Sequence, residues 1–315
     1  MAEDLLLKLD HVGIAAGDLD TATATYDRLG FHLTPAVPAA ATEPGAPSGW
    51  ASRYAMLVSG YLELMGVTDA ALDSPVKAML ARYQGAHIVA FAVSDATRAF
   101  AVLDARTTGM KGVRDLERAA ARTPGERPGG QPERARFRTT HTAADAFPEA
   151  RFVFVEHLTP AVLRPPHLID HPNGALRLAE IAICAGDFIE SRMRIAALLG
   201  ADPHAEDADT AVWHLAQGGL RLLSEAGLRR WTPGVQPPHL PCVAGLTIEV
   251  AHLHKTRDLL EARGIAFAES LAEGDDGEST PVALRIDPQE THGVVILFTQ
   301  VEDRTHPQAP LVGPE

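Results

Sequence analysis

Histidine and carboxylate side chains occur in this sequence at positions that suit metal binding or proton transfer. The chain has 14 histidines, and imidazole both binds metals and titrates near neutral pH. His11 lies in an apolar run seven residues before Asp18, and Glu63 lies inside the run YLELM. A buried carboxylate is costly unless it is paired or binds a cation. A core histidine and a glutamate on the solvated face of its strand are the structural alternatives.

Three further residues are candidates on the same grounds. Glu180 also stands seven residues before an aspartate, Asp187, and could be a ligand, a general base or a solvent-facing strand residue. Glu156 and His157 are adjacent, so in a regular strand they point to opposite faces and one of them should face a cavity. The common nucleophile, zinc-protease and nucleotide-binding motifs do not occur. The two cysteines, Cys184 and Cys242, form neither a disulfide framework nor a zinc pattern.

The composition narrows the classes of partner. With 28 basic and 41 acidic side chains the formal net charge is −13, which disfavours binding to nucleic acid or to anionic membranes. No apolar run approaches the ~18 residues of a membrane span, and the N-terminus is acidic where a signal peptide would be basic. We therefore expect a cytoplasmic protein with a small-molecule substrate or ligand, and a homodimer if the chain self-associates.

The elements that must position these residues repeat four times. Each repeat has an apolar strand, a polar turn, an amphipathic helix and further strands, which is a βαβββ module of an α+β fold. Asp18, Asp95 and Asp187 stand at expected helix N-caps. The first strand and helix of each module fall at 9–35, 87–110, 177–201 and 245–267, and the closing strands at 60–66, 151–156, 219–224 and 293–298.

The repeats predict two halves. Residues 1–158 form an N-terminal half of two modules, a proline-containing connector follows, and residues 172–301 form a C-terminal half, with a polar tail at 302–315. The segment 118–150 is rich in Arg, Pro, Gly and Ala and is expected to be the least ordered interior part. The first module could pair with the second or with the fourth.

Four such modules resemble the vicinal oxygen chelate superfamily, which includes glyoxalase I, extradiol dioxygenases, methylmalonyl-CoA epimerase, and fosfomycin and bleomycin resistance proteins. More narrowly, they are similar to four-module glyoxalase-like domain proteins. The segments that carry the resemblance are LDHVGI at 9–14, GYLEL at 60–64, EHLTP at 156–160, RP at 164–165, HPNG at 171–174 and THGVVI at 291–296. The resemblance implies that the modules pair into two cupped, eight-stranded half-barrels.

The resemblance also implies a metal that chelates two neighbouring oxygens of a substrate. The implied ligands are His11, Glu63 and His157, a set suited to Fe, Mn, Ni or Zn, with Glu63 or Glu180 moving the proton. The implied reaction is that of a lyase, an isomerase or a dioxygenase.

A metal-free protein that binds a metabolite or sequesters an antibiotic is the alternative. The C-terminal half has Gly245 and Leu297 where ligands would stand, so it is expected to be degenerate, which favours this alternative. An aromatic content of only 5% disfavours it.

Overall fold

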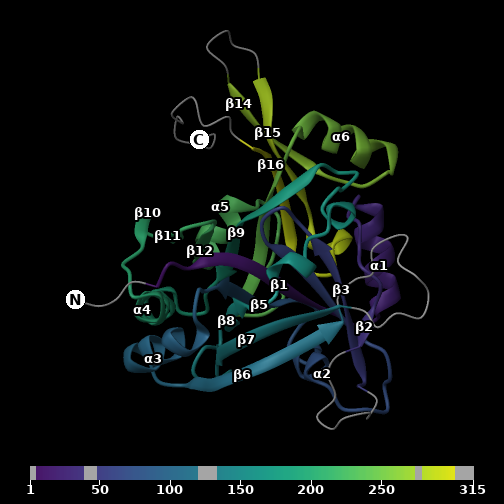
Figure 1. Ribbon diagram of the computed structural model, residues 1–315. Coiled ribbons are helices and arrows are strands. Elements are labelled where there is room, and N and C mark those ends of the chain that lie inside the picture. Colours follow the sequence, from purple (N-terminus) through teal and green to yellow (C-terminus); the bar gives the residue numbers. More distant parts are fainter. Residues whose placement is uncertain (1–4, 39–47, 120–132, 274–278, 302–315) are drawn as a thin grey trace.

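The computed structural model describes residues 5–38, 48–119, 133–273 and 279–301, and it contains the four expected βαβββ modules (Figure 1). Module one comprises β1 (Lys8–Ala16), α1 (Leu19–Arg28), β2 (Val37–Pro38), β3 (Trp50–Met56) and β4 (Tyr61–Val67). Module two comprises β5 (Gly85–Ala92), α3 (Ala96–Arg106), β6 (Met110–Ala119), β7 (Arg134–Thr142) and β8 (Arg151–His157). Module three comprises β9 (Ala175–Cys184), α4 (Phe188–Leu199), β10 (His204–Asp207), β11 (Thr210–His214) and β12 (Gly219–Leu223). Module four comprises β13 (Cys242–Val250), α6 (Leu253–Ala262), β14 (Ala268–Glu273), β15 (Ser279–Ile286) and β16 (Val295–Gln300). Short helices α2 (Pro75–Leu80) and α5 (Glu225–Trp231), with 3-10 turns at Pro160–Val162, Pro166–Leu168 and Pro288–Glu290, connect them. The predicted fold class is confirmed.

The module helices begin where the sequence predicts. The side chains of Asp18, Asp95 and Asp187 accept hydrogen bonds from backbone N–H groups in the first turns of α1, α3 and α4, which satisfies donors that have no partner inside a helix. In the described part of the chain no helix is long and apolar enough to cross a membrane.

Strand pairing joins module one to module two and module three to module four. β1 runs antiparallel to β5, and each is parallel to the last strand of its own module, β4 or β8. β9 and β13 repeat this arrangement with β12 and β16. Each half therefore has eight strands, ordered β2-β3-β4-β1-β5-β8-β7-β6 and β10-β11-β12-β9-β13-β16-β15-β14.

The two halves share one hydrophobic core. A single cluster of buried side chains contains Phe91 and Phe154 of the N-terminal half together with Leu246 and Phe298 of the C-terminal half. β13 also pairs with β5 through Val243 and Ala86, and the Tyr26 hydroxyl of α1 donates to the carbonyl of Thr291 at 3.1 Å.

The face of the N-terminal sheet that points away from this shared core carries the candidate residues, and we call it the cup face. Because side chains alternate along a strand and directly paired residues share a face, strand register defines this face. In module one, Glu63 of β4 pairs with Gly13 of β1 on one side and with Tyr54 of β3 on the other. Gly13 in turn pairs with Ile88 of β5, which places Ile88 and Ala90 on this face. Ala90 pairs with Val153 of β8, and His157, further along β8, pairs with Phe137 of β7. The cup face thus brings strands of both modules to one surface.

The expectation of disorder over 118–150 is wrong for its second part. Residues 134–142 form β7, where Ala135, Phe137 and Thr139 are buried while Arg134 and Arg136 are exposed. That alternation is typical of a half-buried strand, and the arginine-rich composition concealed it. Residues 120–132, like the tail at 302–315, lie outside the described residues.

Contact between the halves depends on a glycine. Gly293 has φ +92°, and a Cβ there would lie 2.1 Å from the carbonyl oxygen of Gln84, beside β5. Gly234 has a similar φ of +87° with nothing within 4 Å of the position of a Cβ.

We expect Gly293→Ala to destabilise the protein more than Gly234→Ala does. Both substitutions carry the positive-φ penalty of about 1 kcal/mol or more, but only Gly293→Ala also forces the two halves apart, for a total of roughly 3 kcal/mol. Urea unfolding of both variants measures the difference. Equal losses of unfolding free energy would show that the halves do not press together here.

Candidate active site

A β-bulge at Asp10 creates the centre of the candidate site. In the β1–β5 ladder Leu9 pairs with Phe91 and His11 pairs with Ala90, which leaves Asp10 without a partner residue. In a regular strand Asp10 and His11 would point to opposite faces. Here their side chains meet, with Nδ1 of His11 2.8 Å from Oδ2 of Asp10, and both residues are buried.

Asp10 also contacts the second module. Its Oδ1 lies 2.7 Å from Nε2 of His157, at the end of β8. Burial alone would raise the pKa of Asp10, but the hydrogen bonds from His11 and His157 outweigh it and hold the pKa well below its usual range. An ionised carboxylate only accepts hydrogen bonds, so Nδ1 of His11 and Nε2 of His157 both donate.

The other nitrogen of His11 faces Glu63. His11 stacks on Tyr61 with ring centroids 4.5 Å apart, and its Nε2 lies 3.8 Å from Oε2 of Glu63. That separation is too long for a hydrogen bond. A third polar atom lying to one side of this pair would be within hydrogen-bond distance of both.

Glu63 is oriented through its second oxygen. The Ser52 hydroxyl donates to Oε1 at 2.8 Å and the Tyr54 hydroxyl donates to it at 3.3 Å. Burial and the charge of Glu63 raise the pKa of Tyr54, so its hydroxyl keeps the proton that it donates. Oε2 is therefore the oxygen turned toward His11.

The remaining candidates lie elsewhere. Glu156 accepts from the backbone N–H of Ala96 at 3.0 Å, at the start of α3, so His157 and not Glu156 reaches the site. Glu180, on β9 in the C-terminal half, forms a two-oxygen ion pair with Arg221 at 2.8 and 3.1 Å. The structure thus brings together His11, Glu63 and His157 but not Glu180.

Sequence reasoning missed Asp10. Strand alternation places Asp10 on the face opposite His11, and no sequence pattern marks the bulge. The available signal was the carboxylate itself, because an aspartate inside an apolar strand needs a partner.

A family model of the glyoxalase-like domain matches residues 9–199, which is more than half of the chain and spans this site. The chain belongs to the glyoxalase-like domain family. This family lies within the vicinal oxygen chelate superfamily. No curated protein sequence matches the chain.

Solved structures share the fold of this glyoxalase-like protein at low identity. A hypothetical protein from Staphylococcus aureus aligns with a TM-score of 0.61 and 12% identity, covering 94% of this chain and 100% of that one. A variant of 4-hydroxymandelate synthase from Streptomyces coelicolor aligns with a TM-score of 0.57 and 17% identity, covering 94% and 93%. A xylose isomerase-like TIM barrel/4-hydroxyphenylpyruvate dioxygenase fusion protein aligns at 0.56 and 11%, covering 95% of this chain and half of that one.

The glyoxalase-like modules supply unequal numbers of metal donors. Ile88 of module two corresponds to His11, since each stands seven residues before the aspartate that caps the next helix. Val153 corresponds to Glu63, since it occupies the same position in β8 relative to β5 that Glu63 occupies in β4 relative to β1. Module two therefore has apolar side chains at both positions. Among the described residues, no group of three His, Cys, Asp or Glu side chains is placed to hold a metal ion. His11 and Glu63 offer two donors. Nε2 of His157 is engaged by Asp10, whereas its Nδ1 is buried without a hydrogen-bond partner.

The C-terminal half of this glyoxalase-like protein is filled at the corresponding place. A Cβ on Gly245 of β13 would lie 2.7 Å from the ring of Trp231. The indole thus occupies the space that a ligand-bearing side chain would need.

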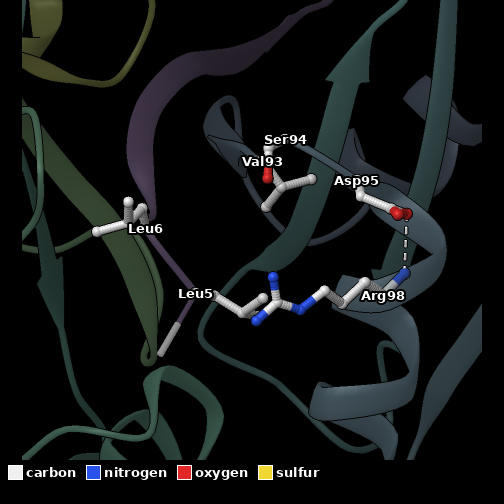
Figure 2. A pocket seen from close by; sticks show the side chains of 6 residues that line it. All are labelled: Leu5, Leu6, Val93, Ser94, Asp95 and Arg98. Atoms are coloured by element: carbon white, nitrogen blue, oxygen red, sulfur yellow. Dashed lines mark hydrogen bonds between the residues drawn. The ribbon is translucent and has the colours of Figure 1, made fainter. Parts of the chain in front are cut away.

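A small pocket lies apart from the His11–Glu63 site. Figure 2 shows it between the segment before β1 and the start of α3, lined by Leu5, Leu6, Val93, Ser94, Asp95 and Arg98. The Asp95 carboxylate turns to the backbone N–H of Arg98 as a helix cap (Figure 2). Because this carboxylate caps α3, we assign no chemistry to the pocket.

We expect Asp10→Asn to destabilise the protein by about 1–3 kcal/mol at pH 7, because it removes a charge that two imidazoles share. The pKa of Asp10 is lower in the folded than in the unfolded chain, so its stabilisation is complete above about pH 4 and is lost as the pH falls below that value. Urea unfolding at pH 7 and pH 3 tests this.

The difference between wild type and Asp10→Asn should therefore shrink at pH 3. The exposed Asp104 of α3 supplies the control, since Asp104→Asn should change little at either pH. A deficit of equal size at both pH values would contradict the assigned role of the Asp10 charge.

Proposed function

We propose that the cup face of the N-terminal half is the active site of an enzyme that moves a proton on a small molecule with neighbouring oxygens. The observation that carries this proposal is that Nε2 of His11 and Oε2 of Glu63 lie 3.8 Å apart without a hydrogen bond between them, with Asp10 on the far side of the imidazole. A base, an oriented imidazole and a buried carboxylate behind it form a common acid–base arrangement. Isomerisations and eliminations that pass through an enolate both begin with this step.

In the proposed reaction Glu63 removes a proton from a carbon next to a carbonyl. The C–H bond breaks, an O–H bond forms at Oε2, and the electron pair moves to the carbonyl oxygen as an enolate. His11 in its protonated form donates from Nε2 to that oxygen, and Asp10 stabilises the cation. On a hydroxy ketone, Glu63 returns the proton to the former carbonyl carbon while the neighbouring hydroxyl gives its proton back to His11 and becomes the new carbonyl, which completes an isomerisation. If the carbon on the other side of the reacting carbon carries a leaving group, re-formation of the carbonyl expels that group with its electron pair and completes an elimination.

We assign the removal of the substrate proton to Glu63 and not to Glu180. Both oxygens of Glu180 contact Arg221, whereas Oε2 of Glu63 has no hydrogen bond within the described residues. One structural neighbour is a fusion protein that contains a 4-hydroxyphenylpyruvate dioxygenase, which supports a 2-oxo acid as the first substrate class to test.

A metal-assisted reaction is the second candidate. Nε2 of His11 and Oε2 of Glu63, 3.8 Å apart, are the two side-chain atoms that would hold an Fe, Mn, Ni or Zn ion. Asp10 would then orient the His11 ligand through Nδ1. Bound there, the ion would polarise a substrate oxygen. With Nε2 of His157 bonded to Asp10, only its Nδ1, which has no hydrogen-bond partner, would be left to act as a third ligand.

Deuterium exchange tests the proton transfer. Phenylpyruvate in deuterated buffer should exchange its C3 protons, followed by NMR, faster with the protein than in buffer alone. Glu63→Gln and His11→Gln should each lower the protein-dependent rate roughly 100-fold or more. Asp104→Asn should not. Loss of the rate in Glu180→Gln with retention in Glu63→Gln would reverse the assignment, and binding of phenylpyruvate without exchange would favour the binding-protein alternative.

Metal removal separates the two candidates. Because no three potential ligands are grouped to hold a metal ion among the described residues, we expect exchange to survive dialysis against EDTA. Elemental analysis of protein purified without a histidine tag is the companion measurement. One divalent ion per chain in the wild type, lost in His11→Ala together with the exchange, would establish the metal-assisted reaction instead.

A further inference from the structure

A cluster of basic side chains lies on the cup face of module two. It comprises Lys111 and Arg114 of β6, His141 of β7 and Arg151 of β8, which we call the basic cluster. Lys111 pairs with His141, Arg114 pairs with Thr139, and His141 pairs with Val153, two residues from Arg151. Three adjacent strands therefore present four basic groups in neighbouring rows of the same face as Glu63.

The basic cluster lacks the partners that buried cations normally have. Nε of Arg151 and Nδ1 of His141 are buried without a hydrogen-bond partner. Within the described residues none of the four side chains forms an ion pair with a carboxylate. Lys111 and Arg114 are exposed and solvated, but Arg151 and His141 are only partly exposed. A buried, unpaired polar group is costly, so a solvated surface patch does not explain these two.

The basic groups also disfavour one another's charge. Burial and the charge of Arg114 lower the pKa of Arg151 to about 10. Burial and the cations Arg151, Arg114 and Lys111 lower the pKa of His141 to about 4. Glu63 acts in the opposite direction on Arg151 and so stabilises its charge. A bound anion would offset the repulsion and supply the missing acceptors.

We propose that the basic cluster binds the anionic group of the ligand, a carboxylate or a phosphate, beside Glu63. Arginine presents a planar fork of donors that fits either group, and a local cationic surface on a chain of net charge −13 concentrates small anions at this point. The inference rests on the proposed function in placing the reactive carbon at Glu63. It narrows the substrate class to small organic anions.

Calorimetric titration with sodium pyruvate and with sodium sulfate, at constant ionic strength, tests the subsite without turnover. The wild type should bind one anion per chain, with pyruvate tighter if the group is a carboxylate and sulfate tighter if it is a phosphate. Arg151→Gln and the exposed Arg114→Gln should each weaken binding about 10-fold or more. Arg136→Gln, on the opposite face of β7, should bind as the wild type does.

A proton balance gives a second readout. Neither pyruvate nor sulfate titrates near pH 5. An anion that raises the proton affinity of His141 should therefore cause the protein to take up protons on binding at pH 5. Binding heats measured in buffers of different ionisation enthalpy give the number of protons taken up. His141→Asn should remove the uptake. Absence of binding, or equal affinities in Arg151→Gln, Arg114→Gln and Arg136→Gln, would overturn the subsite.

The subsite and the proposed reaction can fail separately. Glu63→Gln should bind the anion at least as tightly as the wild type, since it removes a neighbouring negative charge, while losing deuterium exchange. Exchange without anion binding would retain the reaction and reject the subsite. Anion binding without exchange would retain the subsite and reject the reaction.

Discussion

The candidate site depends on one buried negative charge. Asp10 is only 4% exposed, and two imidazoles, one from each N-terminal module, compensate for its loss of solvent. The bulge that turns Asp10 toward His11 is a departure from the regular β1–β5 ladder, and such departures often occur next to active sites. The same contact ties β1 to β8. The orientation of His11, and through it the gap to Glu63, therefore depends on how the two modules pair.

The two halves have the same strand pairing but different interiors. In the N-terminal half polar groups line the cup face on both sides of Glu63: Ser52 and Tyr54 of β3 on one side, and His11 of β1 and then the basic cluster on the other. In the C-terminal half Glu180 is neutralised by Arg221, and Trp231 packs against Gly245. Packing of the two halves into one core gives the second half a structural role in supporting the first.

Periodic features of the fold could be predicted from the sequence, and local irregularities could not. Apolar spacing, the three aspartate caps and the closing strands located the modules because each reports regular backbone geometry. The Asp10 bulge breaks that regularity, so alternation assigned Asp10 to the wrong face. β7 was missed for a different reason: its arginines dominate the composition, while its buried Ala135, Phe137 and Thr139 carry the strand signal. The basic cluster assembles from three strands and depends on register, which composition does not encode.

Protonation of the His11 ring tests the central claim most directly. Long-range proton–nitrogen NMR correlations of the histidine side chains report which ring nitrogens carry protons. If Asp10 accepts a hydrogen bond from His11, Nδ1 of His11 is protonated in the wild type at neutral pH, and its resonance shifts strongly in Asp10→Asn. A His11 ring protonated at Nε2 alone in the wild type would contradict the account, because the imidazole would then have no hydrogen bond to the buried carboxylate.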